Sequence, residues 1–587
     1  MSALINALDN CTPIQRGENG HSEYAWSNNV QERISQFHFQ LTRADKPTIH
    51  QLFTVLDGLL IDLSGNHEYL SILYKIIGET RDVIDGKGEC ALAYMQLLAW
   101  SNHYPKLAKL AFRYFVIGDN EMVVHPYGSW KDVKNLVKFI ETYDHPIITK
   151  SKKSKSKKKV KTINYELSEK NVLVSYAVEL INEQLRKDAV SETPSLAAKW
   201  VPREKSQNSA LFVRLAYDYF ANYLNSATTE DTLNRAKTKA KMDYRHLISS
   251  LNKKLDTVQI KQCANNWSEI EPSAQTSVTM HKQKKAFLNI TKKGEQRTTL
   301  DDRIFCSAKF VEFANKAEKG EVAIKGKRVG LNDFTKEAIS LVYKNDTPEA
   351  HILNAQWVNN STQTGALGKM VAMVDVSGSM NGDPLHAAIA LGIRIAEKSS
   401  LGKRVLTFSD RPSWVNLDGC SNFISCVSTL QRAEWGMSTN FEAGLRLILD
   451  AIVEHSLPAE EVEGMVLVIL SDMQINSGGS LSLSMMDLIK DEYAKAGMKV
   501  CGRPYNPPHI LFWNLRSTTG FPALSSHQNA SMMSGFSPAL LNLFCSEGME
   551  SLKNSTPWST LIKGLNNPRY SVLQLGDEIP PTHSTSV

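Results

Sequence analysis

The sequence has little that would place the protein in a membrane or in an oxidising compartment. No stretch of its 587 residues approaches the ~18 uninterrupted apolar residues that a membrane-spanning helix needs. The first residues lack a basic start followed by an apolar run, which predicts that there is no signal peptide. The eight cysteines are scattered and form no CxxC pair, which is typical of reduced thiols. We therefore expect a cytoplasmic protein with no membrane partner, or a nuclear one if the host is eukaryotic.

The common catalytic signatures are also missing. The chain contains no HExxH zinc-protease motif, no GxSxG nucleophile elbow and no protein-kinase motif set. A phosphate loop is excluded at Gly86-Lys87, because Arg81 stands where the first glycine of GxxxxGK would be needed. We therefore expect that the protein is not an enzyme.

Positive charge is present in excess, and it is concentrated in the first half of the chain. Eight lysines and no acidic residue lie between Lys150 and Lys161, and residues 232–330 hold 21 lysines and arginines against 10 acidic residues. This distribution indicates a polyanionic partner. The candidate phosphate-binding residues are Lys152, Lys153, Lys155, Lys157, Lys158 and Lys159 in a loop at 149–162, and Lys237, Lys239 and Lys241 further along. A solvated linker and a nuclear-import signal are the alternatives for the lysine run.

Apolar residues recur at three- and four-residue spacing from about residue 29 to residue 144, which predicts a series of amphipathic helices. The lysine run interrupts this pattern, which resumes near Tyr165 and continues to about residue 345. Because helix follows helix with almost no strand signal, we expect an α-solenoid or an irregular helical array. Three tryptophans in these helical patterns, Trp100, Trp200 and Trp267, are interpreted as core residues.

The pattern changes at Lys369 to strands that alternate with helices. Continuous apolar runs at 370–376 and 465–471 are typical of strands buried on both faces of a parallel sheet. Further strands are expected at 404–409, 509–515 and 530–536, with helices between them. This alternation predicts a doubly wound α/β domain.

An Asp-x-Ser-x-Ser triplet, Asp375, Ser377 and Ser379, directly follows the first of these strands. Thr439 precedes a predicted helix and Asp472 ends the next long strand, so both should reach the same carboxyl edge of the sheet, where open α/β sheets bind ligands. Hard oxygen ligands favour Mg²⁺ or Mn²⁺, and the neutral hydroxyls leave the ion able to bind a carboxylate from outside. The alternative is a polar turn whose serines only cap the following helix.

These motifs resemble those of known families. The ordered set of Asp-x-Ser-x-Ser, threonine and aspartate resembles the metal-ion-dependent adhesion site of von Willebrand factor A domains. In the helical half, TRDVIDGKGECALAYMQLL, HPYGSWKDVKNL and LAAKWVPREKS resemble the helical module of the Ro ribonucleoprotein (TROVE) superfamily. The resemblance is closer to uncharacterised viral, bacterial and plant relatives that combine such a module with a C-terminal A domain.

This resemblance implies an N-terminal all-α helical-repeat (HEAT-like) horseshoe or ring and a C-terminal α/β doubly wound von Willebrand factor A domain. The expected domains are an N-terminal extension at 1–25, a TROVE-like module at 26–345 that includes the loop at 149–162, a connector at 346–368, and an A-like domain with a C-terminal extension at 369–587. It also implies a noncoding or single-stranded RNA partner. No RNA-contact residues are transferred, because the helical motifs depart from those of the Ro proteins.

One of these motifs contains four charged residues, which are Arg81, Asp82, Lys87 and Glu89. They are interpreted as a structural network of ion pairs and turns, with direct RNA contact as the alternative. Three functions follow for the whole chain. They are an RNA-binding ribonucleoprotein component with a magnesium-dependent adhesion site, a metal-dependent protein–protein interaction scaffold without RNA, and a metal-dependent nuclease.

Overall fold

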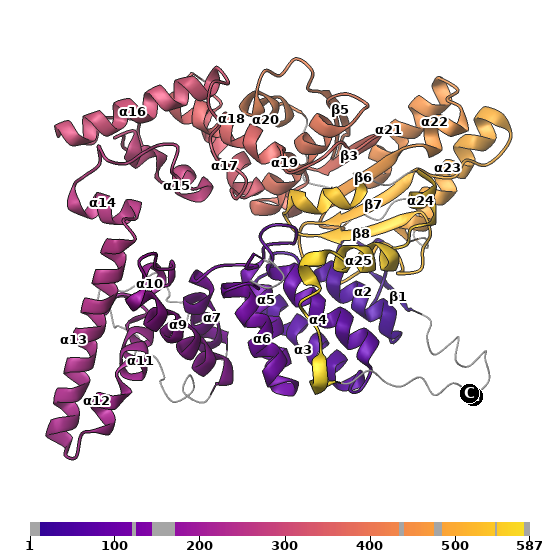
Figure 1. The fold of residues 1–587 in the computed structure, drawn as a ribbon. Coiled ribbons are helices and arrows are strands. Elements are labelled where there is room, and N and C mark those ends of the chain that lie inside the picture. Colours follow the sequence, from indigo (N-terminus) through magenta and orange to yellow (C-terminus); the bar gives the residue numbers. More distant parts are fainter. Residues whose placement is uncertain are drawn as a thin grey trace, which may run out of the picture. The chain divides into compact units, whose positions relative to one another are not determined.

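The computed structural model describes residues 12–119, 125–143, 171–344, 346–433, 439–474, 484–545 and 549–579. The chain forms two compact units, each assembled from separate segments (Figure 1). The α/β unit takes in the described parts of Met1–Val55, Ile84–Glu89 and Glu271–Tyr570. The helical unit takes in those of Leu56–Val83, Cys90–Ile270 and Ser571–Val587. A helical part followed by an α/β part is therefore confirmed.

The helical unit is built from helices joined by short connections. These are α3 (Lys46–Asp62, from Leu56 on), α4 (His67–Arg81), α5 (Cys90–His103), α6 (Pro105–Val116), α7 (Lys131–Tyr143), α9 (Val172–Val190), α10 (Ala197–Trp200), α11 (Ser209–Tyr219), α12 (Ala221–Asn225), α13 (Glu230–Lys254), α14 (Val258–Ala264) and the 3-10 turn η4 (Gly576–Glu578). Two of the predicted breaks act as helix starts. The Asn66 side chain accepts a hydrogen bond from the Tyr69 amide at the start of α4. Pro105 begins α6, where a backbone N–H would have no acceptor within the helix, so proline costs no hydrogen bond there.

The charged motif between α4 and α5 is structural, as predicted. The Arg81 guanidinium donates to both carboxylate oxygens of Asp132, at 2.7 and 2.8 Å, and this ion pair lies inside the helical unit. Lys87 belongs to the α/β unit, where its ammonium group donates to the backbone oxygens of His38 and Leu41 at 2.8 and 3.2 Å. Arg81, Lys87 and Glu89 are buried, which favours the structural interpretation of this motif over direct RNA contact.

The α/β unit contains the strands and the remaining helices. The strands are β1 (Ile14–Arg16), β2 (Ser22–Tyr24), β3 (Met370–Asp375), β4 (Arg404–Phe408), β5 (Ser413–Asn416), β6 (Val466–Ser471), β7 (His509–Asn514) and β8 (Ala530–Ser534). The α-helices are α2 (Val30–Gln40), α15 (Ser277–Phe287), α16 (Asp301–Glu318), α17 (Leu331–Leu341), α18 (Pro348–Ser361), α19 (Asp383–Lys398), α20 (Phe423–Gln431), α21 (Phe441–Glu454), α22 (Ala459–Glu463), α23 (Met485–Cys501), α24 (Met549–Asn554) and α25 (Pro557–Leu565). Three 3-10 segments are η1 (Gly378–Met380), η2 (Pro538–Phe544) and η3 (Pro568–Tyr570).

Six strands form one sheet in the order β5-β4-β3-β6-β7-β8. All neighbouring strands run parallel except β5, which pairs antiparallel with β4 at the edge. The five strands predicted from apolar runs are confirmed as β3, β4, β6, β7 and β8. The chain moves from β3 to β4 on one side and later to β6 on the other, so the topological switch point lies between β3 and β6.

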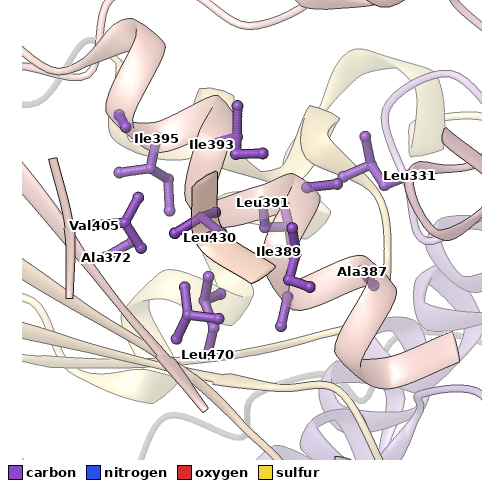
Figure 2. Packing of buried hydrophobic residues seen from close by; sticks show 14 of the residues in the cluster. Leu331, Ala372, Ala387, Ile389, Leu391, Ile393, Ile395, Val405, Leu430 and Leu470 are labelled. Atoms are coloured by element: carbon purple, nitrogen blue, oxygen red, sulfur yellow. The ribbon is translucent and has the colours of Figure 1, made fainter. Parts of the chain in front are cut away.

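Helices cover both faces of this sheet, and side chains of β3 alternate between them. Ala372 and Val374 join the cluster formed with α17, α19 and α20, whereas Met373 joins the cluster formed with α21 and α23. Figure 2 shows the first cluster, in which Ile395 of α19 lies beside the strand residues Ala372 and Val405. This three-layer arrangement holds β3 at the centre of the sheet, so the turn that follows it has a rigid base.

The N-terminal segment packs against the end of the α/β unit. Tyr24 of β2 exchanges two backbone hydrogen bonds with Phe521, both at 3.0 Å. The Asn514 side chain donates to the backbone oxygen of Phe39 at 3.1 Å, and the Gln40 side chain accepts from the Thr518 amide at 2.9 Å. The β1–β2 hairpin and β5 are absent from the prediction, because strands of three or four residues carry too few residues for a periodic signal.

Among the described residues, no helix combines the length and the apolar character that a transmembrane span requires.

Candidate metal centre

The predicted triplet forms one tight turn at the end of β3. The Ser377 amide donates to Oδ1 of Asp375 at 2.9 Å, which folds the chain back over the strand end. The hydroxyls of Ser377 and Ser379 lie 3.1 Å apart and share a hydrogen bond. Because Gly378–Met380 makes a single 3-10 turn, the carboxylate and both hydroxyls are close to one point. This is the local arrangement that the spacing of two predicts.

The neighbouring strand β6 brings a second carboxylate to the same edge. The Ser471 hydroxyl donates to Oδ2 of Asp375 at 2.6 Å, and Asp472 is the next residue along. Asp375 and Asp472 are both 0% exposed. Burial, and after it the charge of Asp472, raise the pKa of Asp375 to about 7, since two buried carboxylates repel each other. The edge between β3 and β6 therefore concentrates negative charge away from water.

In the described part of the chain, one carboxylate oxygen of Asp472 has no hydrogen-bond partner. Its Oδ1 accepts from the Gln474 amide at 3.2 Å, whereas Oδ2 is buried and accepts no hydrogen bond among the described residues. Burial raises the pKa of Asp472, while the Gln474 amide and the Ser379 hydroxyl lower it, which places Ser379 beside this carboxylate. A buried, unsatisfied carboxylate oxygen is costly unless a cation binds it. The donor set of two carboxylates and two hydroxyls fits a hard divalent cation.

Thr439 is the least constrained of the five predicted ligands. It is 2% exposed and precedes Asn440, whose amide donates to the backbone oxygen of Ser409 at 3.2 Å. Ser409 follows β4, and Phe408 of β4 is the register partner of Asp375. Thr439 thus lies next to the end of β4, on the correct edge. In the part of the chain that the structure describes, no hydrogen bond joins its hydroxyl to the other four residues.

Two further residues belong to this edge and were missed by sequence reasoning. Ser471 holds the second oxygen of Asp375, and the Arg516 guanidinium donates to the backbone oxygen of Ser379 at 2.7 Å. The positive charge of Arg516 lowers the pKa of Asp472. A Ser-Asp pair at the end of β6 is a local signal that could have revealed Ser471. Arg516 carries no such signal, because only the pairing of β6 with β7 brings it here.

The candidate phosphate-binding lysines form two groups, of which the structure describes only the one on α13. Those in the loop, Lys152, Lys153, Lys155, Lys157, Lys158 and Lys159, lie outside the described residues. The other three lie on α13, where Lys239 donates to Asp243 at 2.7 Å and to the hydroxyl of Tyr223 at 3.1 Å. Lys237 and Lys241 are half-buried on the same helix. The charge of Lys239 is therefore already paired within the helical unit.

A different basic cluster surrounds Trp200 in the helical unit. The ammonium groups of Lys131, Lys134 and Lys199 lie 5.7, 5.3 and 5.8 Å from the centre of the Trp200 ring. Burial lowers the pKa of Lys134, and the neighbouring charges of Lys131 and Lys138 lower it further. None of the three lysines around the ring pairs with a carboxylate among the residues described. Trp100 is fully buried, as its interpretation as core predicts, whereas Trp200 and Trp267 are only half-buried.

The fold and this edge define an α/β protein with an acidic, hydroxyl-lined centre at the switch point of its sheet. The α/β part is similar to a family described as "Domain of unknown function (DUF7788)", which matches residues 369–564 and so takes in all five predicted ligands. The chain is also 27% identical over 488 residues to "Uncharacterized protein L728" of Acanthamoeba polyphaga mimivirus, a match that covers 81% of this chain and 76% of the viral protein.

Proposed function

We propose that the α/β unit binds Mg²⁺ or Mn²⁺ through Asp375, Ser377, Ser379, Thr439 and Asp472, and that the bound ion captures a carboxylate of a partner protein. The observation that carries this proposal is the buried Oδ2 of Asp472, which accepts no hydrogen bond from the described residues and lies beside a second buried carboxylate. A divalent cation would neutralise both charges. The serine and threonine ligands are neutral, so the ion keeps affinity for one more anionic oxygen.

The topology supports a relationship to von Willebrand factor A domains. The Asp-x-Ser-x-Ser turn follows the central strand, and Asp472 follows the strand across the switch point. This edge is where open α/β sheets bind ligands. We propose that the unit is an A-like domain and that the triplet, Thr439 and Asp472 form its metal-ion-dependent adhesion site.

The metal proposal is tested by titrating the full-length protein with MgCl₂ and following its thermal unfolding. Mg²⁺ should raise the unfolding temperature of the wild type and leave that of Asp375→Ala unchanged, because only a folded centre binds the ion. Asp450→Ala is the matched control, since Asp450 is an exposed aspartate on α21. An equal change of the unfolding temperature with Mg²⁺ in all three proteins would rule out the proposed metal site.

The adhesion step needs a separate test, because a metal can bind without a partner. A synthetic peptide library with and without a central aspartate or glutamate should bind the Mg²⁺-loaded protein only when the acid is present. EDTA and Asp375→Ala should each abolish that binding, and Asp450→Ala should keep it. Binding that survives EDTA would leave the metal site standing but remove its adhesive role.

A second candidate function is RNA binding by the helical unit, and the cluster around Trp200 favours it. Lys131, Lys134 and Lys199 surround an aromatic ring and have no carboxylate partner among the described residues. Bases stack on exposed aromatic faces, and neighbouring lysines bind the phosphates as point charges. Together with the resemblance to the Ro ribonucleoproteins, this supports a ribonucleoprotein component whose helices form a horseshoe or ring.

The RNA proposal is tested with a fluorescent single-stranded RNA at low salt. Replacing Lys131, Lys134 and Lys199 by glutamine should weaken binding and lower the slope of log affinity against log salt by about two to three, since each phosphate contact contributes just under one. Replacing Lys237, Lys239 and Lys241 by glutamine is the matched control. If this control variant lost more RNA affinity than the variant of Lys131, Lys134 and Lys199, the RNA-binding site would lie on α13 instead.

The two alternatives make different predictions in the same assays. A protein–protein interaction scaffold without RNA should ignore RNA even at low salt, yet still need Mg²⁺ for partner binding. A metal-dependent nuclease should cleave RNA faster with Mg²⁺ and lose that cleavage in Asp472→Ala. Intact RNA after incubation with Mg²⁺ would exclude the nuclease.

A further inference from the structure

A second group of side chains that can bind a metal ion lies in the α/β unit, in a segment that contributes no ligand to the proposed adhesion centre. Glu318 ends α16, Asp346 lies in the connection between α17 and α18, and His351 is in the first turn of α18. One ligand atom of each residue lies within 4.8 Å of the others. Three residues from two helices and a connection therefore converge on one point.

The histidine is the buried member of this group. His351 is 7% exposed, whereas Glu318 and Asp346 are exposed and face the same point from the outside. The Nε2 atom of His351 lies 3.2 Å from Oε1 of Glu318 and 3.4 Å from Oδ1 of Asp346. It makes no hydrogen bond to either oxygen, and no other partner among the residues described. The ring nitrogen is thus aimed between two carboxylates without being bonded to them.

Asn315 contacts the other ring nitrogen of His351. Oδ1 of Asn315 lies 3.3 Å from Nδ1 of His351 and accepts a hydrogen bond only if Nδ1 carries the proton. In the tautomer with its proton on Nδ1, the lone pair of Nε2 faces two carboxylate oxygens, which are also acceptors. Three acceptors directed at one point repel one another unless a cation lies between them. Metal-binding histidines usually donate their second ring N–H to an oxygen acceptor, and Oδ1 of Asn315 is such an acceptor here.

The distances fit tetrahedral coordination by a small ion. With metal–ligand bonds of about 2.0–2.1 Å, two tetrahedral ligand atoms lie about 3.3–3.4 Å apart, close to the separations found for Nε2. In that geometry each oxygen lies well off the axis of the nitrogen lone pair, so neither forms a near-linear hydrogen bond with Nε2. One nitrogen and two carboxylate oxygens suit Zn²⁺ better than Mg²⁺, which demands six oxygen ligands.

We propose that Glu318, Asp346 and His351 form a zinc site distinct from the strand-end centre, with its fourth position open to solvent. The ion would join the end of α16 to the start of α18. α18 in turn packs on the sheet's flanking helices, where Trp357 stacks on Phe423 of α20 with ring centres 3.8 Å apart. Zinc would thus fix α16 to the body of the α/β unit, and its exposed ligands would make occupancy responsive to the free zinc concentration.

The proposal is tested on the full-length protein in saturating Mg²⁺, so that the other centre cannot report on zinc. Calorimetric titration with ZnCl₂ should show one zinc ion more per chain in the wild type than in Asp346→Asn. Because Asp346 is fully exposed, this variant removes a ligand without disturbing the core. Glu321→Gln, an exposed carboxylate three residues from Glu318, is the matched control and should bind zinc like the wild type.

Two further variants separate a metal site from a simple ion pair. His351→Gln should lose the additional zinc and also the intense visible absorption that Co²⁺ gives in a tetrahedral site. Asn315→Leu keeps all three ligands but should weaken zinc binding about 10–100-fold, as loss of a ligand-orienting hydrogen bond does. Asp375→Asn should leave zinc binding unchanged. Equal zinc binding by the wild type, Asp346→Asn and His351→Gln would overturn the proposal.

Discussion

Two aspartates at adjacent strand ends dominate the chemistry at the residue scale. Asp375 and Asp472 are fully buried at the switch point, where the described residues offset their charge with hydroxyls, amides and the nearby Arg516. The pKa of Asp375 is raised from 3.8 to about 7, first by burial and then by the charge of Asp472. In the absence of a cation, this centre destabilises the folded protein at neutral pH.

The pH dependence of stability tests that destabilisation. A carboxyl whose pKa is raised by folding binds a proton that the unfolded chain has released, so stability falls as pH rises from 3.8 to about 7 and stays low above that value. Asp375→Asn removes the charge and keeps the shape. Without divalent cations, we expect this variant to unfold at a higher temperature than the wild type at pH 8, with a smaller difference at pH 5. Differential scanning calorimetry at both pH values measures this.

The comparison needs a control for charge alone. Asp450→Asn removes an exposed aspartate and should shift the unfolding temperature equally little at both pH values. In saturating Mg²⁺ the order should reverse, with the wild type more stable than Asp375→Asn, because only the wild type binds the ion. A wild type that stays more stable than Asp375→Asn at pH 8 without any divalent cation would contradict the repulsion between the two aspartates.

At the scale of elements, the position of the centre depends on how closely helices approach β3. A Cβ on Gly392 of α19 would lie 2.7 Å from Cγ2 of Val374, and one on Gly444 of α21 would lie 3.0 Å from Cε of Met373. The two glycines therefore let helices on opposite faces approach the central strand. The end of that strand carries Asp375, so helix packing sets where the ligand turn lies.

Gly392→Ala tests this close packing. The added methyl group overlaps Val374, so we expect the unfolding free energy to fall by about 1–3 kcal/mol, the usual cost of overpacking a dense core. Val374→Ala in the same chain makes room for the methyl group, so the double variant should lose less stability than the sum of the single variants. Chemical unfolding of the four proteins measures both effects.

The control for this series is Gly419→Ala, where a Cβ would meet no atom within 4 Å. Its unfolding free energy should lie close to that of the wild type. Strict additivity of Gly392→Ala and Val374→Ala would mean that the two side chains do not contact each other, and would contradict the packing described for α19.

At the scale of the whole molecule, the α/β unit is assembled from segments that are distant in sequence. Residues 12–55 belong to it together with 271–570, and Tyr24, Phe39 and Phe521 are buried within one cluster. The Glu32 carboxylate accepts a hydrogen bond from the Ser525 amide at 2.7 Å. The N-terminal segment thus completes the hydrophobic core of the unit. The domain boundaries predicted at residues 25, 345 and 368 stay predictions, although α18 occupies most of the predicted connector.

A fragment test follows from this assembly. A chain of residues 346–587 contains every strand of the large sheet but lacks the N-terminal segment. We expect it to aggregate or to unfold without cooperativity, because Phe521 and its neighbours would be exposed. Co-expression with residues 12–62 should recover soluble protein that unfolds cooperatively. A 346–587 fragment that is monomeric and cooperative alone would show that the segment is dispensable.

The sequence by itself determined the type and order of the main elements and the turn that carries Asp375, Ser377 and Ser379. Both are local properties: periodicity follows from the helix and strand repeats, and ligand spacing within one turn follows from the backbone. Only the tertiary structure decided that Ser471 and Arg516 join this edge, that lysines surround Trp200, and that β2 pairs beside Phe521. These contacts join residues far apart in the chain, and no repeat or spacing in the sequence encodes which distant partner a buried side chain meets.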